Sequence, residues 1–236
     1  MMANRNDDDS AAAPATRRRV GRPRAGVLSK RLITETCLRL IDERGTEAAS
    51  MRAIAAELGV RPSALYNHVA GYNELIAGVR ELISERIPVD AFEREPWDAA
   101  LATWARHYRD VFAAHPSLVA LLAVLPLAEE SVTTVMYEAV IAKLGDAGWP
   151  DTHAVTVLVA LESFVLGSAL DLSAPDDMLD PGPRDDVPRF SSAYRARAAL
   201  LAETGTRPAD ASFELGLRAL IAGFSAELAS LAATGR

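Results

Sequence analysis

Residues 50–69 read SMRAIAAELGVRPSALYNHV, and this stretch predicts two short helices joined by a tight turn. Ser50 is a favourable N-cap, and the apolar residues that follow it recur at helical spacing: Met51, Ile54, Ala55 and Leu58. Gly59 can end this helix, and Pro62 suits the first turn of the next one. Such a short turn fixes a steep angle and leaves the second helix standing out from the body. A projecting helix with small and hydrogen-bonding side chains suits the DNA major groove.

A further helix is predicted just before this pair. Ser29 can cap a helix that ends at Arg44, before Gly45, and its apolar positions again follow helical spacing: Ile33, Cys37, Leu40 and Ile41. Cys37 is interpreted as a small core residue, with a reactive thiol as the alternative. Together with a fourth helix at 72–87, these segments predict a helix-turn-helix domain over residues 27–87.

The composition favours an all-α protein. Its 236 residues are 50% hydrophobic and only 6% aromatic, and no segment alternates like a strand. We expect no membrane span, because Glu162 and Gly167 interrupt the richest apolar stretch. The polar N-terminus has no signal-peptide core, and the single cysteine allows no internal disulfide. These features predict a soluble, cytoplasmic protein.

Charge is divided unevenly along the chain. The net charge is −7, yet residues 1–70 hold 12 Lys and Arg against 8 Asp and Glu, a balance of +4. This pattern indicates a basic head that contacts a polyanion, attached to an acidic body. Residues 1–26 contain RRRVGRPRAG and predict a disordered basic tail. Its Gly-Arg-Pro core is typical of an AT-hook for narrow A·T minor grooves, and a solvated tail with diffuse attraction is the alternative.

Residues 88–236 are predicted to form a larger helical domain. Helices are expected from 96 to 114 and near 117–124, 128–146, 151–172, 190–204 and 209–233. The Pro- and Asp-rich segment 173–190 predicts a mobile loop. Two helices of this domain, 151–172 and 209–233, are apolar over more than one face, so they need a second burial partner. Close approach of two subunits would be allowed by Gly167, Gly216 and Gly223.

The segment SMRAIAAELGVRPSALYNHVAGYNEL resembles the helix-turn-helix of the tetracycline repressor (TetR) family of bacterial transcription factors. The body resembles the ligand-binding domain of the tetracycline repressors through PWDAALATWARHYRDVFAAHP, GWPDTHAVTVLVALESFVLGSALD and FELGLRALIAGFSAEL. The resemblance covers about residues 27–233. It implies a two-domain repressor that binds double-stranded, palindromic operator DNA as a homodimer and is released by a small ligand.

The same resemblance implies a set of DNA contacts. It implies a base contact on the second helix, at Arg52. It also implies a set of contacts on the recognition helix, at Arg61, Pro62, Ser63, Ala64, Tyr66, Asn67 and His68. Arginine can bind a guanine edge, and Asn67 can bind adenine or a phosphate. Tyr66 and His68 are expected to hold phosphates, although Tyr66 could instead pack between helices. Tyr72 stands where the family usually has a phosphate-gripping lysine, so it keeps one donor without the charge.

The resemblance also implies a ligand pocket, at Trp104, Tyr108, Leu122, Tyr137, Val140, Phe164 and Asp171. Pro88 and Leu122 stand where the tetracycline repressors have histidines, and one carboxylate, Asp171, makes a poor metal site. We therefore predict no tetracycline, no metal and no other cofactor. The expected effector is apolar or aromatic, uncharged or weakly anionic. Ordinary core packing is the alternative for each of these residues.

Two other classes of protein compete with this interpretation. An α-helical enzyme is disfavoured because the four histidines are scattered and no nucleophile elbow, phosphate loop or dinucleotide fingerprint occurs. His107 and His115 flank one helix and could form a proton relay, with capping or packing as the alternative. A helical adaptor that binds only protein is the third possibility, and a gel-shift assay would separate all three.

Overall fold

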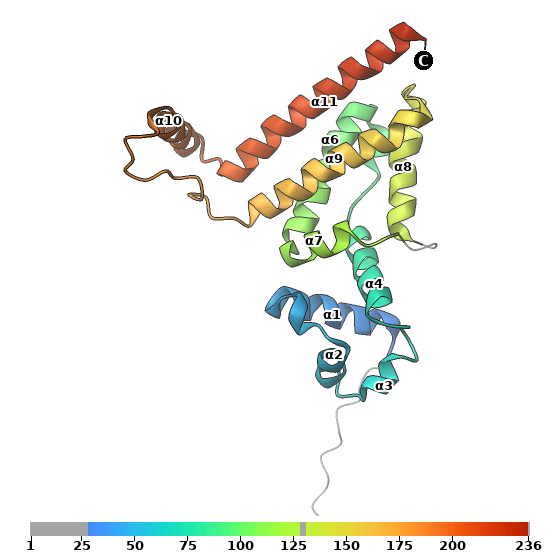
Figure 1. The fold of residues 1–236 in the computed structure, drawn as a ribbon. Helices are drawn as coiled ribbons and strands as arrows, with labels where there is room; N and C mark the ends of the chain where they lie inside the picture. Colours follow the sequence, from blue (N-terminus) through green and yellow to red (C-terminus); the bar gives the residue numbers. More distant parts are fainter. Residues whose placement is uncertain (1–27, 128–130, 236) are drawn as a thin grey trace, which may run out of the picture.

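The computed structural model describes residues 28–127 and 131–235, and Figure 1 shows that its regular elements are helices. They are α1 Lys30–Arg44, the short 3-10 helix Thr46–Ala48, α2 Met51–Glu57, α3 Pro62–Leu65, α4 Tyr72–Ser84, α5 Ala91–Arg94, α6 Trp97–Ala113, α7 Pro116–Ala123, α8 Val132–Asp146, α9 Asp151–Leu172, α10 Pro188–Thr204 and α11 Pro208–Thr234. The predicted all-α class is confirmed. The predicted basic tail lies outside the described residues.

The helix boundaries of the head follow from local side chains. Ser29 accepts a hydrogen bond from the amide of Leu32 at 3.2 Å, and Ser50 accepts one from the amide of Ala53 at 3.2 Å. Both predicted N-caps are therefore confirmed. Gly59, with φ of +67°, forms the turn after α2 in a conformation that disfavours side chains with a Cβ.

The head is held together by one apolar layer between α1 and α4. The predicted apolar positions of α1 are fully buried: Ile33, Cys37, Leu40 and Ile41. They belong to the same hydrophobic core as the buried face of α4, formed by Leu75, Ile76 and Val79. Burial raises the pKa of the Cys37 thiol to about 12. The interpretation of Cys37 as a core residue is confirmed.

The third helix is shorter than predicted. It covers only Pro62–Leu65, whereas the expected helix ran to about Val69. One further turn follows, in which the amide of Val69 donates to the carbonyl of Leu65 at 3.1 Å. The next amide, that of Ala70, donates instead to the side chain of Glu74 in the first turn of α4. The helix does not continue beyond this turn, because the Ala70 amide is bonded to α4 and not to a carbonyl of the preceding turn.

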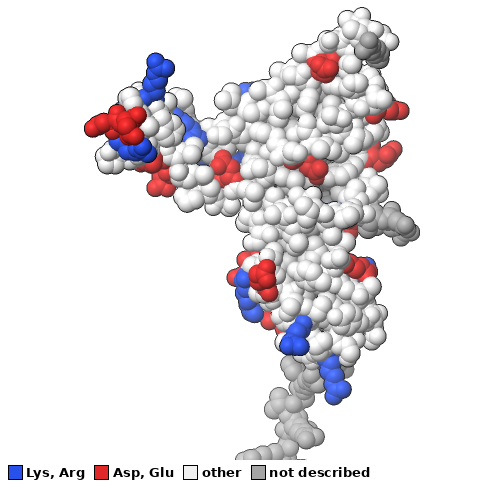
Figure 2. Space-filling view, in the orientation of Figure 1, with Lys and Arg blue, Asp and Glu red and all other residues white. Residues whose placement is uncertain are grey.

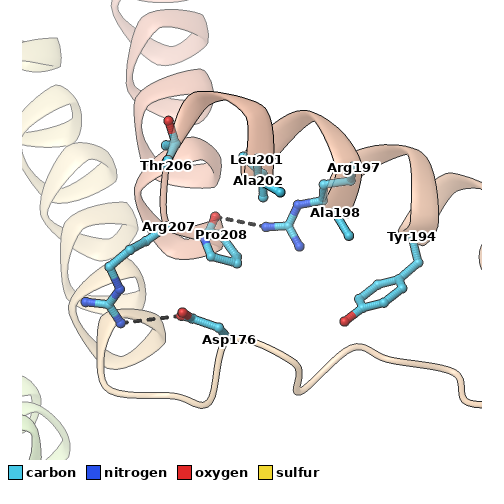
Figure 3. Close-up of a pocket in the computed structure, with 10 residues that line it drawn as sticks. Asp176, Tyr194, Arg197, Ala198, Leu201, Ala202, Thr206, Arg207 and Pro208 are labelled. Atoms are coloured by element: carbon cyan, nitrogen blue, oxygen red, sulfur yellow. Dashed lines mark hydrogen bonds and ion pairs between the residues drawn. The ribbon is translucent and has the colours of Figure 1, made fainter.

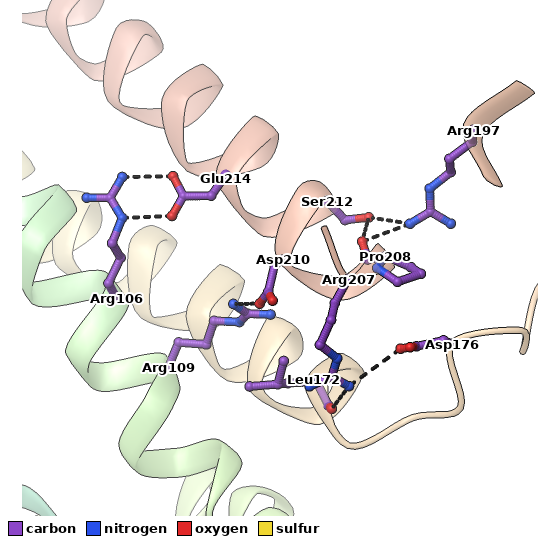
Figure 4. Close-up of polar contacts among 10 residues, drawn as sticks. All are labelled: Arg106, Arg109, Leu172, Asp176, Arg197, Arg207, Pro208, Asp210, Ser212 and Glu214. Atoms are coloured by element: carbon purple, nitrogen blue, oxygen red, sulfur yellow. Dashed lines mark hydrogen bonds and ion pairs between the residues drawn. The ribbon is translucent and has the colours of Figure 1, made fainter. Parts of the chain in front are cut away.

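The body is built on α6, α9 and α11, which pack side by side beyond the end of α4 (Figure 1). Two arginines of α6 fasten α11 (Figure 4). Arg106 forms a two-point ion pair with Glu214 at 2.7 and 2.8 Å, and buried Arg109 pairs with Asp210 at 2.7 Å. The Arg109 guanidinium also lies 4.4 Å from the centre of the Phe213 ring. The start of α11 is thus fixed to the core.

The outer faces of α9 and α11 are apolar and exposed, as Val155, Val159, Leu170 and Leu215 illustrate. Figure 2 shows that the visible surface over these helices is largely uncharged. Both helices are long and apolar enough to cross a membrane by length and composition alone, with mean hydropathy of 1.8 and 1.4. Glu162 and Gly167, on which the expectation of no membrane span depended, do not by themselves lower the mean hydropathy of α9 below such a threshold. In the most apolar 18-residue window of each helix, only 28% is buried within the chain for α9 and only 6% for α11.

The glycines of these helices do not all have the expected role. A Cβ on Gly216 would lie 2.6 Å from the Phe164 ring, so this glycine lets α11 approach α9 within one chain. Gly167 and Gly223 have no heavy atom within 4 Å of such a Cβ. These two positions leave open surface where a second subunit could approach.

The helix α10 stands away from the body (Figure 1), after the non-helical segment 173–187. Ser191 is its single buried residue. Arg197 joins α10 to the start of α11, donating to the carbonyl of Pro208 at 2.8 Å and to the Ser212 hydroxyl at 3.0 Å (Figure 4). Few contacts therefore fix this helix within a single chain.

Candidate nucleic-acid interface and ligand cavity

The outer face of α2 and α3 carries two arginines without acidic partners. Arg52 and Arg61 are exposed, and neither guanidinium pairs with a carboxylate within residues 28–127 and 131–235. In contrast, Arg31 pairs with two glutamates, and Arg39 pairs with Glu43 and Glu57. Basic side chains are visible at this end of the molecule in Figure 2. The free positive charge of the head is thus concentrated on the helix-turn-helix.

Buried Leu65 anchors the short recognition helix, and its other side chains face outward. Pro62, Ser63 and Asn67 are exposed, whereas Ala64 and His68 are half-buried. Tyr66 is 55% exposed, so most of its ring lies outside the helix packing that was the alternative for this residue. This surface has small residues near the helix start and hydrogen-bonding groups at its end, which suits close approach to a groove.

Tyr72 begins α4 and is half-buried against the core of the head. Burial is the largest cause that raises the pKa of its phenol, followed by the charges of neighbouring groups. The hydroxyl therefore stays protonated at neutral pH and can donate one hydrogen bond.

A cavity of about 350 Å³ lies in the body where α4 meets α6, α7, α8 and α9. It is lined by Arg80, Ser84, Tyr108, Phe112, Leu122, Ala123, Leu125, Leu127, Thr133, Tyr137, Val159, Glu162, Ser163 and Leu166. Its size falls in the range of small-molecule sites. Three of the predicted ligand residues meet here, namely Tyr108, Leu122 and Tyr137.

One wall of the cavity is polar. The Tyr108 hydroxyl donates to Oε1 of Glu162 at 2.6 Å, and the Tyr137 hydroxyl donates to the same oxygen. Burial first, and then the negative charge of Glu162, raise the pKa of both phenols. Both phenols therefore remain donors at neutral pH. The apolar or aromatic effector that we predicted from the sequence does not require such a polar wall.

Neighbouring residues of α4 form hydrogen bonds to both sides of the cavity, at the end of α7 and at the start of α8. Arg80 donates to the carbonyls of Leu122 at 2.6 Å and Pro126 at 3.0 Å, and also to that of Leu125. Glu81 accepts from the Ser131 hydroxyl at 2.7 Å and from the first amides of α8. One turn later, Ser84 shares a 2.8 Å hydrogen bond with Thr133. A shift of either flank would therefore act directly on α4.

Four of the predicted ligand residues do not line this cavity. Trp104 is fully buried and makes edge contact with Tyr108, so it lies behind the wall. Val140 is also fully buried, and Phe164 stacks on Phe213 with 5.5 Å between ring centres. Asp171 lies at the far end of α9, beside a small hollow near α10 and α11. Among the described residues, no three His, Cys, Asp or Glu side chains lie close enough together to hold a metal ion.

The sequence interpretation missed the polar cavity residues Arg80, Ser84 and Glu162, as well as Phe112. A signal was present, because Glu162 stands alone in the apolar run VTVLVALESFVLG. A charged group in such a run needs a partner or a function, since burial of an unpaired charge is costly.

A second hollow, of about 380 Å³, lies between α10 and the start of α11. Figure 3 shows Tyr194, Arg197 and Asp176 around it. Arg207 closes its base by donating to the carbonyl of Leu172 at 3.1 Å. This hollow is separate from α4 and is bordered by the loosely attached α10. The cavity beside α4 is therefore the better candidate for a ligand that must influence the head.

A buried histidine connects the head to the body. His115 precedes α7, and its Nδ1 lies 2.9 Å from a carboxylate oxygen of Asp42 in α1. Its Nε2 lies 3.1 Å from Nη1 of Arg86, just after α4. Arginine can only donate, so Nε2 accepts and the proton is on Nδ1. His107 is exposed on α6, and this geometry gives His115 a packing role rather than one in a relay with His107.

Comparisons with known proteins agree with this geometry. Residues 33–79 match the family model described as bacterial regulatory proteins, tetR family, and residues 91–228 match the tetracyclin repressor-like C-terminal domain. The class G tetracycline repressor of Vibrio anguillarum is 29% identical over 212 residues, covering 88% of this chain and 98% of that protein. The repressor DrrR1 of Streptomyces coeruleorubidus is 29% identical over 160 residues, covering 65% of this chain and 57% of DrrR1.

Among solved structures, apo ActR from Streptomyces coelicolor is similar, with a TM-score of 0.70 and 27% identity over 87% of this chain and 98% of ActR. ActR in complex with actinorhodin gives a TM-score of 0.66 and 26% identity over 85% of this chain and 97% of ActR. The two family models together cover the head and most of the body. The chain therefore belongs to the tetR family of bacterial regulatory proteins, as a helix-turn-helix transcriptional repressor and not an enzyme.

Proposed function

We propose that the protein represses transcription as a homodimer on a palindromic operator, and that a small aromatic effector in the cavity beside α4 releases it. The observation that carries this proposal is the outer face of α2 and α3. Within the described residues, Arg52 and Arg61 are exposed without acidic partners, whereas Arg39 is neutralised by glutamates. Free guanidinium groups beside a projecting helix bind guanine edges and phosphates.

Each predicted contact then has a role that its chemistry allows. Arg52 and Arg61 read guanine edges, and Asn67 binds adenine or a phosphate. Phosphates are held by the donors Tyr66, His68 and Tyr72. Close approach of the backbone is permitted by the small or compact residues Pro62, Ser63 and Ala64.

We assign residues 27–87 to DNA binding and residues 88–236 to ligand binding and dimerisation. The tail, residues 1–26, adds attraction to the DNA backbone that is independent of base sequence. Operator DNA lies in the bacterial cytoplasm, so we assign the protein to that compartment.

The dimer is proposed to form through the outer faces of α9 and α11. These faces expose Val155, Val159 and Leu215, while Gly167 and Gly223 leave room for a second backbone. A four-helix interface between two copies would bury them, and two-fold symmetry would match an inverted repeat in the DNA. Sedimentation at micromolar concentration is expected to give about twice the chain mass of 25.3 kDa. A stable monomer would contradict both the interface and the palindrome.

The effector is proposed to occupy the cavity beside α4, without magnesium. Aromatic rings of Tyr108, Phe112 and Tyr137 line this cavity, which favours an aromatic ligand. ActR, which this chain resembles, has been solved with actinorhodin. A ligand that displaces α7 or α8 would pull on Arg80 and Glu81 and thereby tilt α4. About 100-fold release from DNA requires that the ligand prefer the tilted state by about 2.7 kcal/mol.

A gel-shift and footprinting assay with the DNA upstream of the protein's own gene tests the proposal. We expect protection of an inverted repeat with half-sites about one helical turn apart. Arg52→Ala should weaken this complex, whereas Arg39→Ala, which removes an exposed but paired arginine of the head, should not. A dispersed, asymmetric footprint would contradict the proposal, as would equal losses for the two variants.

A further inference from the structure

The polar wall of the cavity contains a carboxylate without a cation beside it. Both phenols, from Tyr108 and Tyr137, donate to the same oxygen of Glu162, its Oε1. Within the described residues, Oε2 of Glu162 accepts no hydrogen bond, and the side chain forms no ion pair. Glu162 lines the cavity, so this second oxygen is available to a molecule inside it.

The nearest candidate for a counterion is already engaged. Arg80 lines the same cavity, but its guanidinium donates to the carbonyls of Leu122, Leu125 and Pro126. These carbonyls end α7 and begin the following loop, where the helix dipole places partial negative charge. The guanidinium of Arg80 is thus occupied by backbone carbonyls, and within the described residues it forms no ion pair with Glu162.

We propose that the effector of this repressor carries a protonated amine that pairs with Oε2 of Glu162. The rest of the molecule would lie against the apolar and aromatic wall formed by Phe112, Leu122 and Leu166. An unpaired carboxylate in a partly dry cavity is unfavourable, so a ligand cation gains more there than in water. Burial is the largest cause that raises the pKa of the two phenols, and the charge of Glu162 is the second; for Tyr137 the charge of Arg80 acts in the opposite direction.

This inference rests on the proposed role of the cavity as the effector site, and it replaces the sequence-based expectation of an uncharged or weakly anionic effector. An anionic ligand would be repelled by Glu162, and the cation of the same cavity, Arg80, already donates to backbone carbonyls. A neutral aromatic ligand would leave Oε2 as it is. The proposal therefore predicts that cationic, neutral and anionic ligands of one shape bind the cavity with decreasing affinity.

Three matched probes separate these classes: 2-(1-naphthyl)ethylamine, 2-(1-naphthyl)ethanol and 1-naphthylacetate. They share one ring system and differ in the charge of the side chain at neutral pH. Calorimetric titration of the full chain is expected to give the tightest binding for the amine, then the alcohol, then the acid. The amine should exceed the alcohol by about tenfold, as a charge-assisted contact with a carboxylate allows.

The Glu162→Gln variant keeps an acceptor oxygen for the two phenols and removes the charge. We expect its preference for the amine over the alcohol to fall below about threefold. Glu138→Gln, an exposed position on α8, is the matched control and should keep the wild-type order. Circular dichroism melting of both variants shows whether the fold is retained. Glu162 joins α9 to α6 and α8 through the two phenols, so the melting temperature of Glu162→Gln shows whether the amide oxygen retains these contacts.

Three results would overturn the proposal. The acid could bind as tightly as the amine, or the amine could show no binding up to millimolar concentrations. The third result is that Glu162→Gln keeps the wild-type preference for the amine over the alcohol. The gel-shift assay with operator DNA, performed without any probe, tests the proposed function separately. Operator binding with the wrong order of probes would refute only the amine effector. Loss of operator binding by the wild-type protein would refute the repressor function itself.

Discussion

The contact between Glu81 and the start of α8 allows a quantitative test of how α4 is attached to the body. Ser131 is the N-cap residue of α8, yet its side chain makes no capping bond of its own. Glu81 of α4 takes that role from another helix, accepting from the Ser131 hydroxyl at 2.7 Å and from the amides of Val132 and Thr133. The carboxylate therefore satisfies two of the free amides of α8 and also faces the positive end of the helix dipole.

Glu81→Ala should lower the free energy of unfolding by about 2 kcal/mol. Loss of an N-cap costs about 1 kcal/mol, and the charge-assisted bond to Ser131 and the dipole interaction together add a similar amount at a half-buried site. Glu85→Ala is the matched control, one turn further along α4. Glu85 forms only an exposed ion pair with Arg31 at 3.2 Å, and such pairs contribute about 0–1 kcal/mol.

Urea denaturation followed by circular dichroism, at one protein concentration for all variants, measures the difference. Glu81→Gln should fall between wild type and Glu81→Ala, because the amide oxygen still accepts while the charge is lost. If Glu81→Ala and Glu85→Ala were equally stable, α8 would not depend on α4 for its cap. The proposed route from the cavity to α4 would then lose its strongest contact.

Three substitutions and one labelling experiment test other parts of the structure. Arg52→Ala should weaken operator binding by about 1–3 kcal/mol per half-site and relax base preference at one position, as gel-shift titration with operator variants would show. Gly59→Ala should destabilise the head by about 1 kcal/mol in denaturation, because φ is +67° there. Cys37, with its pKa raised to about 12, should react with iodoacetamide far more slowly in native than in unfolded protein, as measured by mass spectrometry. Trp104→Ala should cost about 3–5 kcal/mol in thermal unfolding, since the side chain is fully buried in the core.

The head could be predicted closely because its structure depends on short-range chemistry. Ser29 and Ser50 each cap the helix that follows them, and Gly59 provides a backbone conformation within a single turn. The end of α3 was misjudged, and the helix predicted at 72–87 ends at Ser84. The length of α3 depends on the bond between Ala70 and Glu74, which belongs to the next helix and cannot be inferred from helical periodicity.

The cavity could be predicted only in part, because periodicity does not separate a cavity wall from a packed core. Trp104 and Tyr108 are four residues apart and share one face of α6, yet the former is fully buried in the core and the latter reaches the cavity. The difference arises from what packs opposite each ring. Phe92 lies 6.3 Å from Trp104 between ring centres, whereas Tyr108 meets the carboxylate of Glu162.

The polar residues in apolar helices were a better indication of the cavity than the aromatic stripe. A stripe of aromatic residues is stable in any core, so its presence does not require a ligand. Arg80 and Glu162 would each be unfavourable in such a core, and they persist because backbone carbonyls or phenols accompany them. Arg80 donates to three backbone carbonyls of the chain, and its neighbour Glu81 links α4 to α8. Glu162 retains an oxygen that accepts no hydrogen bond within the described residues, and this oxygen is where we propose that the amine of the effector binds.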